Sequence, residues 1–250
     1  MYTLRKSLGQ HFLNDGAMAR RIVEALPVTP GMQVCEIGPG GGALTRFLME
    51  MRAIDLRAIE IDQEKVDYLL SRYPGLEGKL IRGDVLKEKP PFEGAFSIIG
   101  NFPYNISSQI LFRVLEWKTA VPAVVGMFQK EVAQRIASGP GTKAYGILSV
   151  LTQAFYRVEY LFEVPPGCFT PPPKVDSAVI RLTYQGNPYG IAEERKFFTL
   201  IKVSFNQRRK MLRNPLKSFF SPETIKLPIF SKRAEELSVA DFVGLSKQML

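Results

Sequence analysis

The sequence is poor in the residues that build covalent and metal-bound centres. Among 250 residues there is one histidine, His11, and there are two cysteines, Cys35 and Cys168. The cysteines lie far apart and match neither a zinc nor a redox spacing, so neither a disulfide framework nor a metal site is predicted. Two isolated thiols fit a reducing compartment, and a cytoplasmic location is expected.

Long apolar runs are also missing. The first residues lead into no apolar signal segment, and no stretch is long enough to cross a bilayer, so no membrane association is expected. Repeats and low-complexity tracts are absent. The composition, with 46% hydrophobic residues, is still that of a globular protein with a substantial core. The length allows one large domain and a small one.

Acidic residues are scarce in the last quarter of the chain. Residues 185–250 hold 12 Lys/Arg against 6 Asp/Glu, which gives +6 of the total net charge of +9. A polyanionic partner is the leading explanation of this imbalance, and a basic, well-solvated surface is the alternative.

Alternating strand and helix patterns occupy the first half of the chain. The predicted strands cover residues 32–37, 56–61, 80–83, 96–100 and 123–128. Helices are predicted at residues 43–51 and 63–73, which indicates βαβ units and a parallel sheet. A helix over residues 145–155 is followed by two strands, 157–164 and 178–184, without a helix between them. We therefore predict an α/β fold with a seven-stranded, mostly parallel sheet and an antiparallel edge.

A linker pattern at residues 185–190 separates this region from a helical C-terminal part. We predict one domain over residues 1–187 and a small basic helical domain over residues 188–250. In the second domain, Phe198, Ile201, Phe205 and Leu212 fall on one helix face by their spacing.

A glycine turn follows the first predicted strand. Residues 38–43 read G-x-G-x-x-A between a strand and a helix, and Gly38 and Gly40 let a ligand approach the backbone. Glu60 follows Gly38 by 22 residues, close to the spacing at which a carboxylate holds ribose hydroxyls. Asp84 ends the third strand, where it can accept a hydrogen bond from an adenine amino group. These features indicate a nucleoside-containing cofactor, with an ordinary strand–helix turn as the alternative.

The residues directly after the fourth strand narrow the choice of cofactor. Asn101, Pro103 and Tyr104 emerge together at a strand end, where ligands bind in open α/β sheets. The amide can hold an amino group and the ring can stack on a base, and neither has an evident role in hydride transfer. Glu36 can lie near a methionine ammonium group but is unhelpful to a pyrophosphate. S-adenosylmethionine is therefore favoured over NAD.

Five segments carry a resemblance to a known family. They are residues 7–13 (SLGQHFL), 36–40 (EIGPG), 101–107 (NFPYNIS), 169–177 (FTPPPKVDS) and 205–210 (FNQRRK). In this order they resemble the KsgA-type rRNA adenine N6-dimethyltransferases, which have the Rossmann-like class I methyltransferase fold. One departure is Phe102, where leucine or isoleucine is common in the family; an apolar replacement is expected to change little.

The resemblance implies a site, a cofactor and a substrate. The cofactor is S-adenosylmethionine, and the implied contacts are His11, Leu13, Gly38, Glu60, Asp84 and Asn101. Glu60 would bind the ribose hydroxyls, Asp84 the adenine, and Asn101 both the cofactor and the target. The implied target is a pair of adjacent adenosines near the 3′ end of 16S rRNA in the small ribosomal subunit or its precursor, each of which receives two methyl groups. A monomer is expected.

Two acceptors and two aromatic rings form the predicted catalytic group. The side-chain oxygen of Asn101 and the carbonyl of Pro103 would bind the hydrogens of an exocyclic adenine nitrogen, whose lone pair then faces the methyl group. Tyr104 would stack on the target base, with Phe169 as a second wall; for both rings the alternative is a core position. No covalent nucleophile, metal or strong general base is indicated.

A basic cluster is predicted near the end of the C-terminal amphipathic helix. Arg208, Arg209, Lys210 and Arg213 are candidate RNA phosphate contacts, and a solvated helix end is the alternative. Two other functions stay open: an Erm-type methyltransferase acting on 23S rRNA, and a non-catalytic nucleic-acid-binding protein with this fold. An NAD oxidoreductase is a more distant third.

Overall fold

The chain divides into two compact units. A computed structural model describes residues 11–250, so residues 7–10 of the first family motif lie outside the described residues. The first unit holds the chain up to Ala133 together with Glu159–Tyr184, and the second holds Gln134–Val158 and Gln185–Leu250. The assignment of Gln134–Val158 to the second unit was not anticipated from the sequence, because this segment precedes the last two strands. The functional division at residue 188 stays a prediction.

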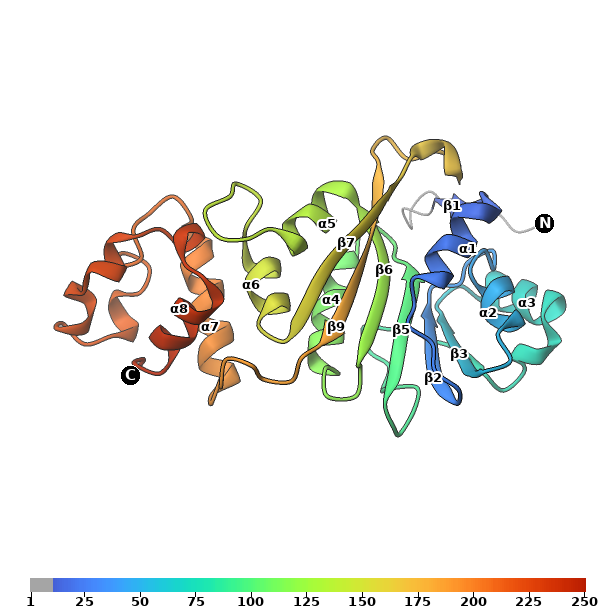
Figure 1. Cartoon of the computed structure of the whole chain (residues 1–250), viewed down its shortest axis with the longest axis horizontal. Coiled ribbons are helices and arrows are strands. Elements are labelled where there is room, and N and C mark those ends of the chain that lie inside the picture. The colour runs from blue at the N-terminus through green and yellow to red at the C-terminus, as the bar shows by residue number, and fades with distance from the viewer. Residues whose placement is uncertain (1–10) are drawn as a thin grey trace. The chain divides into compact units, whose positions relative to one another are not determined.

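A seven-stranded sheet organises the first unit (Figure 1). Its order is β4-β3-β2-β5-β6-β9-β7, and the pairs from β4 to β6 are all parallel, whereas β9 runs antiparallel to β6. The strands are β2 (Met32–Ile37), β3 (Ile54–Glu60), β4 (Leu80–Arg82), β5 (Phe96–Asn101), β6 (Ala123–Gln129), β7 (Tyr156–Val164) and β9 (Ser177–Tyr184). The predicted fold class, a mostly parallel sheet with an antiparallel edge, is confirmed.

Helices precede, connect and follow the parallel strands, and two short strands form a second sheet. The helices are α1 (Gly16–Glu24), α2 (Thr45–Glu50), α3 (Gln63–Arg72), α4 (Ser107–Glu116) and α5 (Lys130–Ala137). The second sheet pairs β1 (Phe12–Leu13) with β8 (Phe169–Thr170) in antiparallel fashion. None of the helices within residues 11–250 is both long and apolar enough to span a bilayer.

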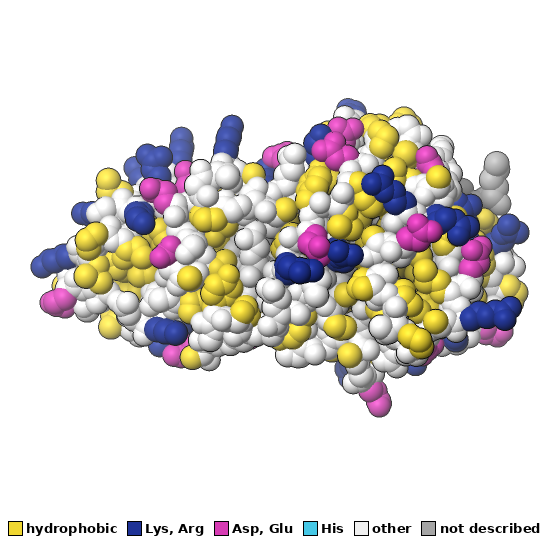
Figure 2. Space-filling model, in the orientation of Figure 1, with side chains coloured by type: hydrophobic (Ala, Val, Ile, Leu, Met, Phe, Trp, Pro, Cys, Tyr) yellow, Lys and Arg dark blue, Asp and Glu magenta, His cyan; other side chains and the backbone are white. Residues whose placement is uncertain are grey.

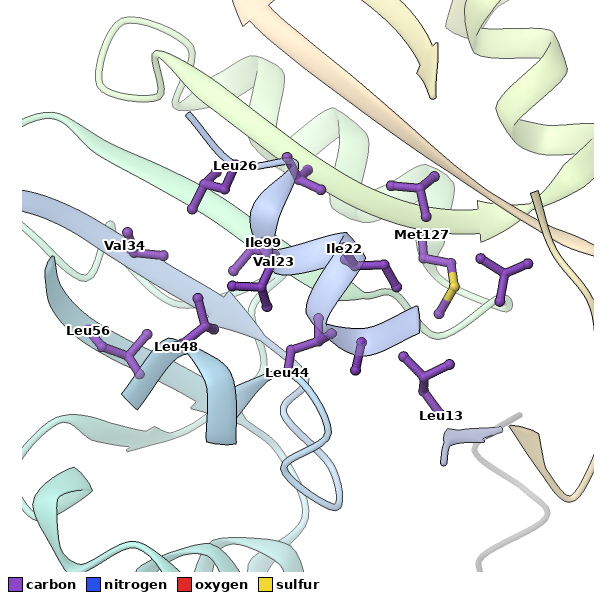
Figure 3. Packing of buried hydrophobic residues seen from close by; sticks show 14 of the residues in the cluster. Leu13, Ile22, Val23, Leu26, Val34, Leu44, Leu48, Leu56, Ile99 and Met127 are labelled. Carbon is purple, nitrogen blue, oxygen red and sulfur yellow. The ribbon is translucent and has the colours of Figure 1, made fainter. Parts of the chain in front are cut away.

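The core of the first unit lies between the sheet and helices α1 and α2. Val34, Leu56 and Ile99 come from three neighbouring strands, and in Figure 3 Ile99 lies beside Val23 of α1 and Leu56 beside Leu48 of α2. In parallel strands that are covered by helices, near-continuous apolar runs are expected, because both faces are buried. This packing holds the sheet rigid beneath the carboxyl ends of its strands.

The second unit is helical, but its main helix differs from the expected one. Its helices are α6 (Ile147–Gln153), α7 (Glu194–Asn206) and α8 (Val239–Ser246), joined by short 3₁₀ turns. The buried face of α7 contains Phe197 and Leu200, whereas Phe198 is only half-buried. Leu212 is buried but lies beyond the end of the helix. Of the predicted face, Ile201 is buried on α7 as expected, whereas Phe205, like Phe198, is only half-buried.

Phe102 occupies a slot that two glycines leave open. Its side chain is 1% exposed, and its ring packs edge-on against Phe128 at a centroid distance of 5.2 Å. A Cβ atom on Gly126 would lie 2.5 Å from the Phe102 ring, and one on Gly100 would lie 2.7 Å from it. The backbone that carries Asn101 and Pro103 is thus anchored by a tightly fitted ring, and the structure gives Phe102 a larger role than an interchangeable apolar residue.

Filling this slot should destabilise the protein. We expect Gly126→Ala to lower the free energy of unfolding by about 1–3 kcal/mol, because overpacking forces the ring or the strand to move. Urea denaturation measures this loss, and Phe102→Leu should recover part of it in the double variant. Gly167→Ala is the matched control, because no atom lies within 4 Å of its added Cβ. Equal stability of the Gly126 and Gly167 variants would contradict the slot.

Candidate active site

A cavity of about 830 Å³ lies at the carboxyl ends of the parallel strands. It collects side chains from the ends of β2, β3, β4 and β5, as expected for an open α/β sheet. The predicted site residues that line it are His11, Leu13, Glu36, Gly38, Gly40, Glu60, Asp84, Asn101, Pro103 and Tyr104. Phe169 is not among the lining residues of the described chain.

Glu60 organises the glycine turn. One carboxylate oxygen accepts a hydrogen bond from the backbone N–H of Gly40 at 3.0 Å. The other oxygen accepts from the N–H groups of Ile61 and Asp62, at 2.9 and 3.0 Å. Gly40 has a positive φ of 56°, a conformation that a larger residue would adopt only with strain. The carboxylate therefore holds the turn open, and its remaining lone pairs can accept from ribose hydroxyls.

Glu36 is a buried carboxyl at the floor of the cavity. It is 1% exposed, and the hydroxyl of Thr45 donates to its Oε2 at 2.7 Å. Burial raises the pKa of Glu36 to about 8, the Thr45 hydrogen bond opposes this rise, and the nearby Glu60 carboxylate adds to it. A buried carboxyl of this kind binds a cation readily, because the cation replaces the proton that compensates its charge.

Asp84 and two apolar residues also line the cavity. Asp84 accepts from the N–H of Leu86 at 3.0 Å, and it keeps part of its side chain exposed. Ile61 and Val85, which directly follow Glu60 and Asp84, both line the cavity, and Ile61 is 55% exposed. We did not identify these two residues from the sequence. The signal that could have revealed them is an apolar residue after each acidic strand end, which suits the faces of a flat base.

Asn101 is oriented by the backbone of His11. Its side-chain Nδ2 donates to the His11 carbonyl at 3.1 Å. The side-chain Oδ1 accepts no hydrogen bond from residues 11–250 and is therefore the amide atom left for a ligand. The Nδ1 of the His11 ring donates to the carbonyl of Pro171 at 2.8 Å. The Pro103 carbonyl already accepts from the N–H of Ile106 at 3.1 Å and has one further lone pair.

The two aromatic residues take different positions. Tyr104 lines the cavity, its hydroxyl is hydrogen-bonded to the Ser177 hydroxyl, and its ring lies 5.5 Å from the His11 ring. Phe169 is 3% exposed and belongs to the apolar core, where it pairs with Leu13 between β8 and β1. The structure thus brings Tyr104 to the site but not Phe169, whose role as a second wall stays a prediction; the neighbouring Thr170 lines the cavity instead.

The basic residues of the second unit lie beyond α7, not on it. The helix ends at Asn206, and Gln207 has left the helical conformation, with φ −118° and ψ 46°. Beyond this end, the Arg208 guanidinium donates to the Glu235 carboxylate and to the Lys143 carbonyl, the latter at 2.7 Å.

The side chains of the four basic candidates therefore differ in how many hydrogen bonds they make to the protein. The guanidinium of Arg208 is tied into the protein, and Arg213 is hydrogen-bonded to Ser231. Arg209 and Lys210 are exposed. Arg213 is exposed as well, so three of the four predicted phosphate contacts present their charges to solvent.

The fold and the site together define a class I methyltransferase that uses S-adenosylmethionine. The family model of ribosomal RNA adenine dimethylase matches residues 1–249. The chain therefore belongs to the ribosomal RNA adenine dimethylase family, and the resemblance that the sequence motifs indicated is confirmed.

Curated relatives agree with this assignment, and two solved structures share the fold. Ribosomal RNA small subunit methyltransferase A of Parabacteroides distasonis is 51% identical over 246 residues, which cover 97% of this chain and 92% of the relative. The protein of the same name from Cytophaga hutchinsonii is 49% identical, over 98% of this chain and 96% of the relative. A dimethyladenosine transferase from Plasmodium falciparum shares the fold, with a TM-score of 0.78, 23% identity and coverage of 96% and 99%. The 23S rRNA methyltransferase ErmE also shares the fold, with a TM-score of 0.74, 24% identity and coverage of 95% of this chain and 99% of that one.

The residues present fit the cofactor. The cavity offers carboxylates for a ribose, an adenine amino group and an ammonium, and it offers apolar faces for the adenine ring. The glycine turn brings the backbone to the cavity without side chains in the way. Membership of this family identifies the chain as a methyltransferase and excludes the alternative of an NAD oxidoreductase.

The buried Glu36 predicts a pH-dependent cofactor affinity. Its pKa in the free protein is raised to about 8, and a bound ammonium group favours the ionised form. Cofactor binding should therefore release a proton below pH 8, and affinity should rise with pH, by up to about tenfold per unit, until it levels off near pH 8. Calorimetry in buffers of different ionisation enthalpy measures the released proton.

Glu36→Gln should remove this proton release and flatten the pH profile. The raised pKa of Glu36 also contributes to the free energy of unfolding of the protein. This stabilising contribution is fully present below pH 4.5 and is lost as pH rises through about 8. Buffer-independent binding enthalpies in the unmodified protein would contradict the assignment of Glu36 as the cation site.

Proposed function

We propose that this chain dimethylates two adjacent adenosines near the 3′ end of 16S rRNA, at their N6 atoms, with S-adenosylmethionine as the donor. The observation that carries the proposal is the Asn101 amide, which the His11 carbonyl orients inside the cofactor cavity. The small-subunit substrate is supported by the names of the relatives that are about half identical over nearly the full length.

The chemistry needs placement rather than a strong base. The bound cofactor supplies an electrophilic methyl group on a sulfonium, a leaving group that needs no proton. An exocyclic adenine nitrogen is a poor nucleophile because its lone pair is delocalised into the ring. Asn101 Oδ1 and the free lone pair of the Pro103 carbonyl accept its hydrogens and favour a pyramidal nitrogen, and the proton lost on methylation leaves to solvent. Positioning of this kind supplies a large share of the rate.

Tyr104 provides the surface on which the target base stacks. A base in a duplex has to leave the stack before it can reach the cavity, and aromatic stacking offsets part of that loss. The cavity volume of about 830 Å³ is large enough for a cofactor and part of a base.

The second unit is proposed to bind the RNA backbone. It contains the whole basic segment of residues 185–250, in which Lys and Arg outnumber acids by 12 to 6. Figure 2 shows Lys and Arg side chains projecting into solvent from the part of the molecule that holds α7 and α8. Contacts of this type position the RNA and carry little sequence information. A role in ribosome biogenesis, a cytoplasmic location and a monomeric state are parts of this proposal.

A methyl-transfer assay with three RNA substrates tests the proposed function. Labelled S-adenosylmethionine is offered with undermethylated small subunits, with 23S rRNA and with free adenosine. We expect labelled dimethyladenosine only in the small subunit. Label in 23S rRNA would favour an Erm-type activity, and the absence of label from all three substrates would contradict the proposed function.

Removing the Asn101 amide should separate binding from chemistry. We expect Asn101→Ala to keep much of the cofactor affinity and to slow methyl transfer by at least about 100-fold, because the target amino group loses a hydrogen-bond acceptor in the transition state. Calorimetry and single-turnover assays measure the two quantities. Asn206→Ala, at the exposed end of α7, is the control. Unchanged turnover in Asn101→Ala would remove Asn101 from the catalytic group.

The basic residues should separate into two groups. We expect Arg209→Gln with Lys210→Gln to weaken rRNA binding and to lower the slope of log affinity against log salt by about 1–2, since each lost phosphate contact contributes about 1. Arg208→Gln should instead lower the melting temperature, because its guanidinium holds Glu235 and the Lys143 carbonyl. Lys79→Gln, which changes an exposed lysine of the first unit, serves as the control. An unchanged salt slope in the double variant would contradict phosphate contact.

A further inference from the structure

The Tyr104 ring is restrained at its far end by Ser177, the last residue of the motif segment 169–177, to which the sequence analysis assigned no role. Its hydroxyl is hydrogen-bonded to the hydroxyl of Ser177, which is 0% exposed. The two residues are 73 positions apart in the chain. We propose that Ser177 is a positioning residue, which acts by fixing the orientation of the Tyr104 ring in the base pocket. This inference rests on the proposed function, in which Tyr104 stacks on the target adenine.

The sheet explains why Ser177 reaches this place. It is the first residue of β9, which runs antiparallel to β6, and it pairs with Gln129, the last residue of β6. An antiparallel strand begins at the edge where its parallel neighbours end. Ser177 therefore lies on the same edge as Asn101, the last residue of β5, and its position is set by backbone pairing rather than by a loop.

The backbone just before Ser177 is also held. The N–H of Lys130 donates to the Asp176 carbonyl at 2.9 Å, and the Lys130 ammonium donates to Glu163 at 2.7 Å and lies 3.7 Å from the Asp176 carboxylate. These groups tie the start of β9 to the end of β6 and to β7. A support that is itself fixed is what a positioning group requires.

Tyr104 is restrained on its other sides too. The Ser107 hydroxyl donates to its backbone carbonyl at 3.2 Å, and the His11 ring lies against its ring at 5.5 Å, tilted by 33°. With the backbone, one ring contact and the hydroxyl all held, the ring plane has little freedom left. A stacking surface that is already oriented does not have to be ordered when the base enters, which favours the productive arrangement.

This arrangement gives the Tyr104 hydroxyl an indirect role. It does not need to contact the base, because the ring face makes the stacking contact and the hydroxyl only fixes the plane of that face. Removing the hydroxyl from Tyr104 and removing it from Ser177 break the same hydrogen bond, so the two changes should have the same small effect. Removing the ring should have a much larger one.

A double-mutant cycle on methyl transfer to undermethylated small subunits tests the proposal. We expect Tyr104→Phe and Ser177→Ala each to lower kcat/KM by about two- to tenfold, the range of one neutral hydrogen bond. The double variant should lose no more than either single one, and cofactor affinity should be unchanged. Tyr104→Ala should lose well beyond tenfold. Additive losses, or full activity in Ser177→Ala, would overturn the proposal.

Two further measurements keep the test decisive. Ser97→Ala is the matched control, because Ser97 is also a fully buried serine of the sheet, and its hydroxyl has no hydrogen-bond partner in the described structure. Its activity should equal that of the unmodified protein. If Ser177→Ala does not fold, Tyr104→Phe and Ser177→Cys, which has a weaker donor, replace it in the comparison; activity of both equal to the unmodified protein would overturn the proposal.

A readout without activity separates this inference from the proposed function. Burial raises the pKa of Tyr104 and the Ser177 hydrogen bond lowers it, so Ser177→Ala should move the titration of the ring to higher pH. NMR of ¹³C-labelled tyrosine, assigned with Tyr104→Phe, measures this shift. A shift with no methyl transfer in the unmodified protein would mean that the proposed function fails while the hydrogen bond stands. Methyl transfer without any shift would overturn the positioning role alone.

Discussion

Parallel pairing of the strands from β4 to β6 is the constraint on which the site depends. Because these strands run in one direction, their carboxyl ends meet at one edge, and the side chains that follow them converge there. Glu60 and Asn101 are the last residues of their strands, and Asp84 follows its strand by two positions. The fold thereby brings together in one cavity the groups that we propose for a ribose, an adenine and a target amine, although none of them is close to another in sequence.

The tetrapeptide at residues 101–104 shows how the fold converts this convergence into defined orientation. The Asn101 amide donates to the carbonyl of His11, the residue just before β1. The Phe102 ring fits into a slot beside Gly100 and Gly126. Tyr104 is held by a hydroxyl on β9. Each side chain is fixed by a different element, so the group as a whole has one arrangement. Chemistry that depends on placement rather than on a strong acid or base needs this kind of preorganisation.

The charges of the two units serve different purposes. In the first unit, Glu36 and Glu60 are buried, so their carboxyl groups hold backbone or hydroxyl donors and favour a cationic ligand. In the second unit, exposed cations dominate, which suits a diffuse, salt-sensitive attraction to a polyanion. Arg208 stands apart from those cations, because its guanidinium stabilises the turn beyond α7 instead of facing solvent.

Local patterns in the sequence predicted the strand positions, the mostly parallel sheet with its antiparallel edge, and the acids and amide at the strand ends, because apolar runs and the residues after them are local signals. The order of the strands in the sheet came only from the structure. Only the tertiary structure decided the partners of those groups. The contacts of Asn101 with His11 and of Tyr104 with Ser177 join residues 90 and 73 positions apart. No local pattern encodes such pairs. For the same reason the burial of Phe169, the fit of Phe102 and the end of α7 before Arg208 followed from packing, which depends on the neighbours that the fold supplies.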